Sequence, residues 1–291
     1  MIDHTPKESI VDVLRASTAR LLASGICSAR LDARVLMSYV LGCDHAWLIA
    51  HGKEDFPSYL NEEYEGLVKR RELLEPVAYL TGIREFWSMP FGVTPDTLIP
   101  RPDSEILVET ALKNMPKKTE RIIDLGTGTG CLLLSLLHER TTLQGVGIDI
   151  SFGAVAVAER NARALGLLER AKFHVGSWGV CANLIEGAPF DAVISNPPYI
   201  PEMEIEGLAP DIRQFEPNHA LNGGGDGLSP YRLISKALPE LLKPGGYFFG
   251  EFGIGQGEKL SDIISSGGLI IEGLQNDASG HQRCIVARMA N

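Results

Sequence analysis

The sequence predicts an α/β protein: a mostly parallel sheet covered by helices on both faces, preceded by a small helical domain. Two observations support this. From Arg121 onward, short apolar runs typical of buried strands alternate with amphipathic helical patterns. Before that point the first 75 residues show only helical periodicity. Alternating strands and helices produce a parallel sheet, because each helix carries the chain back so that the next strand starts at the same end of the sheet as the one before it.

Residues 1–75 form the predicted helical domain. Apolar side chains recur at helical spacing up to Gly25 and again up to Gly42, and both glycines are suitable helix stops. A third helical segment, from about Ser58 to Leu74, places Glu, Lys and Arg between apolar positions. Nothing in this domain is typical of catalysis. A structural cap on the main domain and a substrate-docking module are equally compatible with it.

Residues 76–102 differ in composition, because proline, glycine and aromatic residues replace the helical pattern. Their alternation with turn signals predicts a β-hairpin linker between two domains. The large domain then spans residues 103–291 and opens with a helix that ends near Pro116. Its strands are predicted at about 121–125, 145–149, 172–175, 190–195, 247–251, 269–271 and 284–287. Its helices are predicted at about 132–137, 154–165, 229–242 and 257–264.

Composition narrows the functional class. Hydrophobic residues make up 44% and charged residues 22%, which is ordinary for a soluble globular protein. The net charge of -10 disfavours a protein that grips nucleic-acid phosphates. The polar start, Met1-Ile2-Asp3-His4, does not resemble a signal peptide, and no apolar run is long enough to cross a bilayer. We therefore expect a cytoplasmic protein with no membrane association.

Cysteine and histidine positions predict no metal site. The five cysteines are scattered without C-x-x-C spacing, and no histidine pairs with a cysteine or carboxylate at ligand-like spacing. We expect reduced thiols at Cys27, Cys43, Cys131, Cys181 and Cys284.

The tetrapeptide Asn196-Pro197-Pro198-Tyr199 follows the apolar strand at 190–195, where an open α/β sheet binds its ligands. Proline fixes φ and keeps the residue before it extended, so no local helix uses the carbonyls here. The Asn196 side-chain oxygen and the Pro197 carbonyl are then two acceptors beside the flat Tyr199 ring. Two acceptors and an aromatic wall suit a planar –NH2 group. A proline-rich turn with no ligand is the alternative interpretation.

A second motif joins the strand at 121–125 to the helix after it. Gly126, Gly128 and Gly130 let a ligand approach the backbone closely and expose N–H groups at the helix N-terminus. Their G-x-G-x-G spacing differs from the G-x-G-x-x-G of dinucleotide sites, where Cys131 would have to be glycine. A nicotinamide or flavin cofactor is therefore disfavoured.

Two carboxylates and a tryptophan indicate which cofactor the loop takes. Asp149 ends the second strand, where it can accept both ribose hydroxyls of an adenosine. Asp124 comes just before the glycines and suits a cofactor that carries a cationic amino group rather than phosphate. Trp178, after the third strand, could wall the adenine. S-adenosylmethionine fits all three. Each residue alone is more often a capping or core residue, but their joint position at successive strand ends of one sheet favours a site.

With these two motifs the chain resembles the class I S-adenosylmethionine-dependent methyltransferases that modify planar nitrogens. It is most similar to the peptide chain release factor N5-glutamine methyltransferases, over nearly its whole length. The most specific matches are the segments Pro76-Val77-Ala78-Tyr79-Leu80-Thr81-Gly82, Arg84-Glu85-Phe86-Trp87, Ile99-Pro100-Arg101-Pro102-Asp103-Ser104-Glu105, Phe215-Glu216-Pro217 and Gly224-Gly225-Asp226-Gly227-Leu228.

The resemblance implies a Rossmann-like sheet of seven strands, the last antiparallel, with a hairpin linker and a helical domain that docks the release factor. It implies methylation of the glutamine in the Gly-Gly-Gln motif of release factors, which supports translation termination and leaves S-adenosylhomocysteine as product. Asn196 and Tyr199 are then catalytic, within substrate contacts from Asn196 to Tyr199. The implied cofactor contacts are Gly126, Thr127, Gly128, Thr129, Gly130, Asp149, Trp178 and Asn196, to which the strand-end position adds Asp124. Glu251 is left out of the predicted site, because Phe252 stands where a glycine is expected to follow the acid.

Two other functions are compatible with the motifs. An adenine-amine DNA or RNA methyltransferase could hold a flipped base with the same tetrapeptide, but the acidic balance opposes it. A noncatalytic binding module would have no need for both intact motifs. We expect a monomer whose partner is a release factor, without direct nucleic-acid binding.

Overall fold

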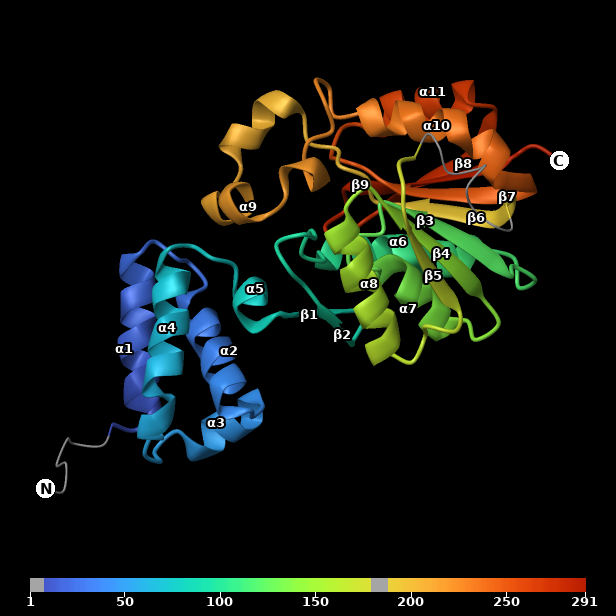
Figure 1. Cartoon of the computed structure of the whole chain (residues 1–291). Coiled ribbons are helices and arrows are strands. Elements are labelled where there is room, and N and C mark those ends of the chain that lie inside the picture. Colours follow the sequence, from blue (N-terminus) through green and yellow to red (C-terminus); the bar gives the residue numbers. More distant parts are fainter. Residues whose placement is uncertain (1–7, 179–187) are drawn as a thin grey trace, which may run out of the picture. The chain divides into compact units, whose positions relative to one another are not determined.

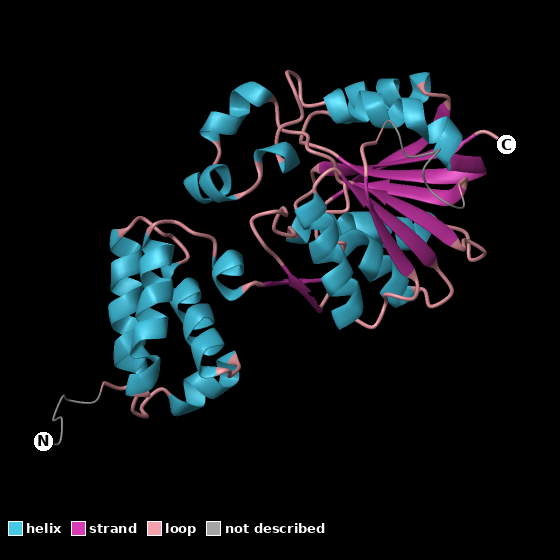
Figure 2. Ribbon diagram, in the orientation of Figure 1, coloured by secondary structure: helices cyan, strands magenta, loops and turns pink. Residues whose placement is uncertain are grey.

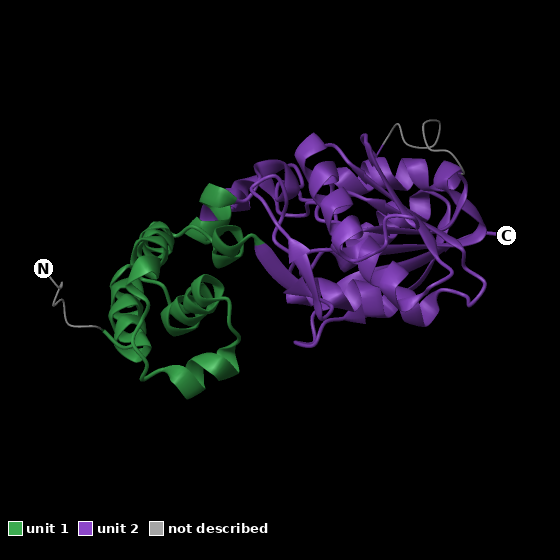
Figure 3. Ribbon diagram, turned by 60° about the horizontal axis from the view of Figure 1, so that its bottom comes forward, with its two compact units in different colours: residues 1–82, 209–215 green, residues 83–208, 216–291 purple. Residues whose placement is uncertain are grey.

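The computed structural model describes residues 8–178 and 188–291. The chain divides into two compact units, which Figure 3 shows in green and purple. The helical unit comprises Met1–Gly82 with Ala209–Phe215, and the sheet unit comprises Ile83–Leu208 with Glu216–Asn291. The polar start at residues 1–4 and Cys181 lie outside the described residues.

The helical unit is built from α1 (Ile10–Ala23), α2 (Ala29–Leu41), α3 (His45–His51), α4 (Asn61–Glu72) and α5 (Val77–Thr81). The Ser9 hydroxyl caps α1 by accepting a hydrogen bond from the Asp12 N–H, and Gly42 ends α2 in the left-handed conformation. Apolar side chains from all five helices share one core. The short α3 was not predicted, and α5 lies where we expected the hairpin linker to begin. The unit also includes α9 (Pro210–Phe215), from the loop after Asn196.

The hairpin belongs to the sheet unit. It pairs β1 (Ile83–Phe86) with β2 (Met89–Gly92) in antiparallel fashion. The side chain of Asn161 fixes it, because Oδ1 accepts from the Gly92 N–H at 2.8 Å and Nδ2 donates to the Gly92 carbonyl at 3.0 Å. The same Nδ2 donates to the Thr129 carbonyl at 2.9 Å. One buried amide thus ties the hairpin to the glycine loop.

The sheet consists of β3 (Arg121–Leu125), β4 (Gln144–Asp149), β5 (Ala171–Val175), β6 (Phe190–Ser195), β7 (Leu242–Glu251), β8 (Leu269–Asn276) and β9 (Gln282–Met289) (Figures 1 and 2). The spatial order is β5-β4-β3-β6-β7-β9-β8, and β9 runs in the opposite direction to the other six strands. The prediction of seven strands with an antiparallel last strand is confirmed. The chain leaves β3 toward β4 on one side and later adds β6 on the other, so the switch point of the topology lies between β3 and β6.

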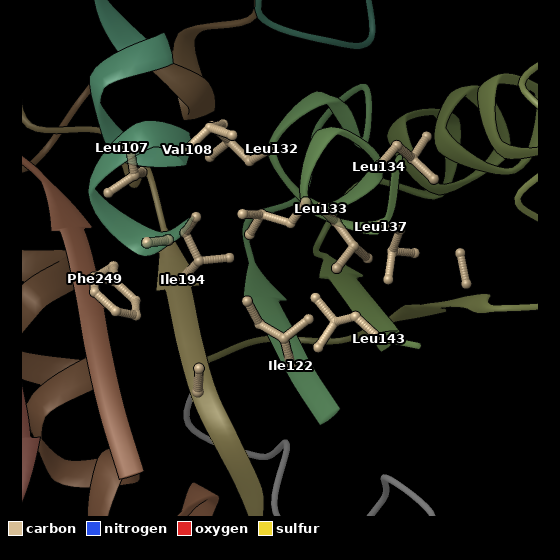
Figure 4. Packing of buried hydrophobic residues seen from close by; sticks show 14 of the residues in the cluster. Leu107, Val108, Ile122, Leu132, Leu133, Leu134, Leu137, Leu143, Ile194 and Phe249 are labelled. Atoms are coloured by element: carbon tan, nitrogen blue, oxygen red, sulfur yellow. The ribbon is translucent and has the colours of Figure 1, made fainter. Parts of the chain in front are cut away.

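In the part of the chain that the structure describes, five helices cover the two faces of the sheet. On one face lie α6 (Glu105–Asn114), α7 (Cys131–Glu139) and α8 (Phe152–Ala164), and on the other lie α10 (Ser229–Leu241) and α11 (Gly257–Ser266). Successive strand residues alternate between the faces: Ile122 and Phe249 pack under α6 and α7 (Figure 4), whereas Ile123 and Phe248 join the opposite core. Both faces of the sheet therefore carry an apolar core.

The segment between β6 and α10, predicted as a loop, contains the 3₁₀ turns Glu202–Gly207 and Asn218–Ala220. Further 3₁₀ turns occupy Ser58–Leu60 and Pro102–Ser104. Within residues 8–178 and 188–291, no helix combines the length and apolarity that crossing a membrane requires.

Candidate active site

The carboxyl ends of β3, β4 and β6 open into a cavity of about 500 Å³, and those of its lining residues that the structure describes all belong to the sheet unit. The glycine loop after β3, Asp149 at the end of β4 and Asn196 after β6 all line it. Further lining residues come from segments 96–101, 150–154, 176–178 and 218–222, from Ser104 and from the starts of α7 and α10. The cavity lies at the switch point, where ligands bind in open α/β sheets.

The glycine loop requires its glycines for conformation. Gly126, Gly128 and Gly130 have φ of +80°, +53° and +79°, a region that strains other residues. A Cβ on Gly130 would lie 3.2 Å from the Cβ of Ala158 in α8, whereas a Cβ on Gly128 would meet no atom within 4 Å. The loop therefore packs tightly against α8 at Gly130 and leaves open space at Gly128, which lines the cavity.

Asp149 connects the glycine loop to the start of α8. Its Oδ2 accepts from the Gly128 N–H and its Oδ1 accepts from the Ser151 N–H, each at 2.9 Å. Each carboxylate oxygen has a second lone pair. Since Asp149 lines the cavity, these lone pairs are the acceptors that a ribose diol requires.

Asp124 is fully buried and is not among the residues that line the cavity. Its Oδ2 accepts from the Thr127 hydroxyl at 2.7 Å, and Oδ1 has no hydrogen-bond partner within the described residues. Burial raises the pKa of this carboxyl to about 7, against the opposing effect of the Thr127 hydrogen bond. Asp124 thus lies beneath the loop, where the structure shows it supporting Thr127.

The other predicted cofactor residues lie on the wall of the cavity. Thr127 and Thr129 are nearly buried yet reach it, and Trp178 lies against Gly126, where a Cβ would come within 3.5 Å of the indole Nε1. The Asp149 carboxylate, the Trp178 indole and the glycine loop are thus brought together from the ends of β4, β5 and β3. That they contact a cofactor stays a prediction.

Asn196 is oriented by a neighbour that the sequence did not indicate. Its Nδ2 donates to the Ser104 hydroxyl oxygen at 3.1 Å, and Ser104 is buried at the start of α6. This hydrogen bond uses one of the two amide N–H groups, and Oδ1 is the acceptor of the side chain. Of the tetrapeptide, Asn196 and Pro198 line the cavity, whereas Pro197 and Tyr199 are not among its lining residues.

Tyr199 is held from several sides. Its hydroxyl donates to Glu251 Oε1 at 3.1 Å, and its carbonyl accepts from Gln256 Nε2 at 2.9 Å. A Cβ on Gly227 would lie 2.3 Å from that carbonyl, so the glycine-rich turn packs directly on the tetrapeptide. Burial raises the pKa of the Tyr199 phenol, so the hydroxyl stays protonated and remains a donor.

Glu251, which we left out of the predicted site, lies at its base. The parallel pairing of β6 with β7 sets Ser195 opposite Gly250, so Asn196 and Glu251 leave adjacent strands at the same level. Glu251 is 2% exposed, and burial raises the pKa of its carboxyl while Ser104 and Tyr199 lower it. The sequence contained a signal for Glu251, because it is an acid at the end of a predicted strand, as Asp124 and Asp149 are. We left it out because residue 252 is phenylalanine where a glycine was expected.

Two of the family-like motifs meet beside the cavity. The guanidinium of Arg101 pairs with the Glu216 carboxylate, which also accepts from the Ile99 N–H at 3.3 Å. Glu216 is 5% exposed, whereas Arg101 lines the cavity. This ion pair holds Glu216 close to the 218–222 segment, which lines the cavity.

Within the described residues no group of His, Cys, Asp and Glu is arranged to hold a metal ion, and Cys27, Cys43, Cys131 and Cys284 are free thiols. The cavity offers the Asp149 carboxylate and the glycine loop on one side and the Asn196 amide oxygen on the other. It can hold a nucleoside cofactor beside a planar –NH2 group.

Comparison with known proteins agrees with this arrangement. Residues 12–82 match the family model of the PrmC N-terminal domain, and residues 116–252 match that of a methyltransferase domain. A release factor glutamine methyltransferase from Rhodospirillum rubrum is 45% identical over 270 residues, covering 92% of this chain and 82% of that protein. A second, from Cereibacter sphaeroides, is 39% identical over 278 residues, covering 96% and 98%.

Among solved structures, the fold resembles a methyltransferase from Pyrococcus furiosus. The TM-score is 0.52 at 13% identity, with 79% of this chain and all of that chain covered. At this identity the likeness concerns the fold alone.

Proposed function

This chain belongs to the family of release factor glutamine methyltransferases, and we propose that it methylates the glutamine side-chain nitrogen in the Gly-Gly-Gln motif of peptide chain release factors. The methyl donor is S-adenosylmethionine, and the product supports translation termination. The observation in this structure that best supports the proposal is that the glycine loop and Asn196 line the same cavity. A donor on the loop and an amide on Asn196 would share one enclosed space.

The residues present fit this cofactor. Asp149 retains lone pairs for the ribose hydroxyls, Gly128 leaves open space at the loop, and Trp178 offers a flat wall for the adenine. The Asp149 carboxylate beside the loop disfavours a phosphate group and suits a ligand that carries a positive charge. When bound, the cofactor supplies a methyl group on a positively charged sulfur.

Orientation of the amide is the task that we assign to the tetrapeptide. An amide nitrogen is a poor nucleophile, because its lone pair is delocalised into the carbonyl. Asn196 Oδ1, on the cavity wall, would accept one N–H of the glutamine amide. The Pro197 carbonyl, our second predicted acceptor, is not on that wall, so its contact requires the amide to reach past Pro198. These hydrogen bonds strengthen as the nitrogen acquires positive charge, so they stabilise the transition state more than the ground state. Such orientation can contribute roughly 7–11 kcal/mol to catalysis.

No general base is required before transfer, since the nitrogen becomes acidic only when it has gained the methyl group. The cavity contributes by excluding water, and apolar side chains such as Leu98, Pro198 and Leu233 line it. The predicted stacking of Tyr199 on the substrate amide would require its ring to reach the cavity, but Tyr199 is not among the lining residues. We therefore propose that the main role of Tyr199 is to hold the shape of the tetrapeptide through its hydrogen bonds to Glu251 and Gln256.

The helical unit is proposed to dock the release factor. Leu31, Val35 and Tyr39 recur every four residues along one face of α2 and are 61%, 38% and 46% exposed. Exposed apolar side chains in a row are typical of interaction surfaces. Replacing Leu31 and Tyr39 by serine should raise the KM for release factor with kcat unchanged, whereas Ile270→Ser, an exposed apolar position in the sheet unit, should change neither.

The proposed reaction is tested directly. Purified protein is incubated with S-adenosylmethionine and either a release factor, the same factor with the motif glutamine replaced by alanine, or duplex DNA. We expect one added methyl group, located on that glutamine by tandem mass spectrometry, in the first reaction alone. Methylation of the alanine variant at similar yield, or of DNA in preference to the factor, would overturn the proposal. We place this reaction in the cytoplasm, in accord with the free thiols of the described residues.

A further inference from the structure

The far end of the tetrapeptide is held by Gln256, which follows β7 and is not among the residues that line the cavity. Its Nε2 donates to the Tyr199 carbonyl and its Oε1 accepts from the Gly253 N–H, each at 2.9 Å. The Gln256 N–H donates in turn to the Gly253 carbonyl at 3.1 Å, which closes residues 253–256 into a turn. Because an N–H group meets Oε1, the NH2 end of the amide has to face the Tyr199 carbonyl.

Glycine backbone encloses this hydrogen bond from two directions. A Cβ on Gly227 would lie 2.3 Å from the Tyr199 carbonyl oxygen and 2.6 Å from Gln256 Nε2. A Cβ on Gly253 would lie 2.9 Å from Gln256 Oε1 and 3.2 Å from Tyr199 Cδ2. Any larger residue at these two positions would therefore displace the donor or the acceptor.

The near end of the tetrapeptide is anchored as well. Ser195 is the last residue of β6, and its hydroxyl donates to the Leu125 carbonyl at 2.6 Å. Three residues separate Ser195 from Tyr199, and two of them are prolines with a fixed φ. A segment with so few free torsions is determined by its two ends. The position of the Asn196 side chain therefore depends on where Tyr199 is held.

We propose that Gln256 is a positioning residue for methyl transfer. By holding the Tyr199 carbonyl it fixes the backbone of the two prolines, and with it the place of Asn196 Oδ1 on the cavity wall. This inference rests on the proposed function, because it assumes that Asn196 accepts a hydrogen bond from the methylated nitrogen.

The test exchanges the amide for a carboxylate of the same shape. Gln256→Glu keeps the acceptor for the Gly253 N–H, but an ionised carboxylate has no proton for the Tyr199 carbonyl. We expect kcat to fall about 10-fold to 100-fold, while the KM for release factor and the dissociation constant of S-adenosylhomocysteine change less than about twofold. Gln144→Glu, the same exchange at an exposed position at the start of β4, should leave all three within about twofold of wild type.

A pH profile separates loss of this hydrogen bond from general damage to the fold. A protonated carboxyl regains a donor for the Tyr199 carbonyl and still offers an oxygen to the Gly253 N–H. The kcat of Gln256→Glu relative to wild type should therefore rise severalfold as the pH falls from about 8 to about 5, toward the ordinary range of a glutamate pKa. Glu251 and Arg283, which also contact Tyr199, are present in both proteins, so the ratio cancels their own titration.

Gly227→Ala perturbs the same hydrogen bond from the opposite side and should also lower kcat about 10-fold or more. Its matched control is Gly166→Ala. The two glycines have similar φ, +76° and +70°, but a Cβ on Gly166 would meet no atom within 4 Å. The control thus introduces the same backbone strain without the contact, and its kcat should stay within about twofold of wild type.

A folded Gln256→Glu enzyme with wild-type kcat would overturn the inference, as would a loss of kcat that is constant over this pH range. If Gln256→Glu does not fold, the glycine pair decides, and equal kcat for Gly227→Ala and Gly166→Ala would then overturn the inference. A wild-type protein that does not methylate release factor at all would instead overturn the proposed function.

Discussion

Replacing Asp149 by asparagine tests the cofactor site most directly. The change keeps the size of the side chain but removes its charge and one acceptor oxygen. In the wild type both oxygens accept backbone N–H groups at 2.9 Å, and their remaining lone pairs are the proposed ribose acceptors. The variant can satisfy only one of these N–H groups, so the hydrogen bonds to the ligand and the shape of the loop are weakened together.

The expected loss follows from the kind of hydrogen bond. A hydrogen bond to a charged group contributes roughly 1.5–3 kcal/mol, which corresponds to a dissociation constant about 10-fold to 150-fold higher. Isothermal titration calorimetry with S-adenosylhomocysteine measures it, with Asp191→Asn as a matched carboxylate control. To separate ribose contacts from loop damage, the same titrations use an analogue that lacks both ribose hydroxyls.

The difference in affinity between wild type and Asp149→Asn should be smaller for this analogue than for S-adenosylhomocysteine. The reason is that the hydrogen bonds between residue 149 and the ribose hydroxyls are missing from both complexes of the analogue. An unchanged affinity of Asp149→Asn for S-adenosylhomocysteine would refute the reasoning. An equal loss for the complete ligand and the analogue would assign Asp149 to the loop rather than to the ribose.

Three further predictions concern catalysis and stability. Asn196→Ala should lower kcat about 10²-fold, as loss of one transition-state hydrogen bond does, while calorimetry shows cofactor affinity largely retained. Burial raises the pKa of Asp124 from its ordinary 3.8 to about 7, so its carboxyl binds a proton in the folded protein that the unfolded chain has released. Its contribution to stability is therefore present below the unfolded pKa and is lost as pH rises toward 7, so Asp124→Asn should gain about 3 kcal/mol relative to wild type between about pH 5 and pH 8 in urea unfolding. Gly147→Ala should lower the free energy of unfolding by about 1–3 kcal/mol, because its Cβ would lie 2.5 Å from Phe173 Cδ1 and 2.8 Å from Thr127 Oγ1.

Each has a contrary outcome. Turnover of Asn196→Ala close to wild type would remove that residue from catalysis. A constant difference in stability between Asp124→Asn and wild type across the pH range would show that the carboxyl is ionised throughout. A Gly147→Ala protein as stable as wild type would mean that Phe173 and the loop can move aside, and a crystal structure of the variant would reveal that shift.

The local chemistry of the site could be predicted from the sequence, because it depends on short segments. A proline pair fixes its own backbone, and three alternate glycines between a strand and a helix indicate a loop that approaches a ligand. Asp149 was identified because a strand end is recognisable from the apolar run before it. The seven strands and the antiparallel last strand were likewise expected from the family resemblance, and the structure confirms them.

The tertiary structure decided which of these groups meet. Nothing in the order of residues along the chain shows that Ser195 pairs opposite Gly250, so the contact between the tetrapeptide and Glu251 depends on how β6 and β7 pair. Burial is equally nonlocal: Asp124 and Asp149 both end strands, but Asp124 lies beneath the loop and Asp149 on the cavity wall. Ser104 lies 92 residues from Asn196 along the chain and yet orients its amide. The sequence by itself thus determined which chemical groups follow the strands. Strand pairing and packing determined which of these groups contact one another, because both act between segments that lie far apart in the sequence.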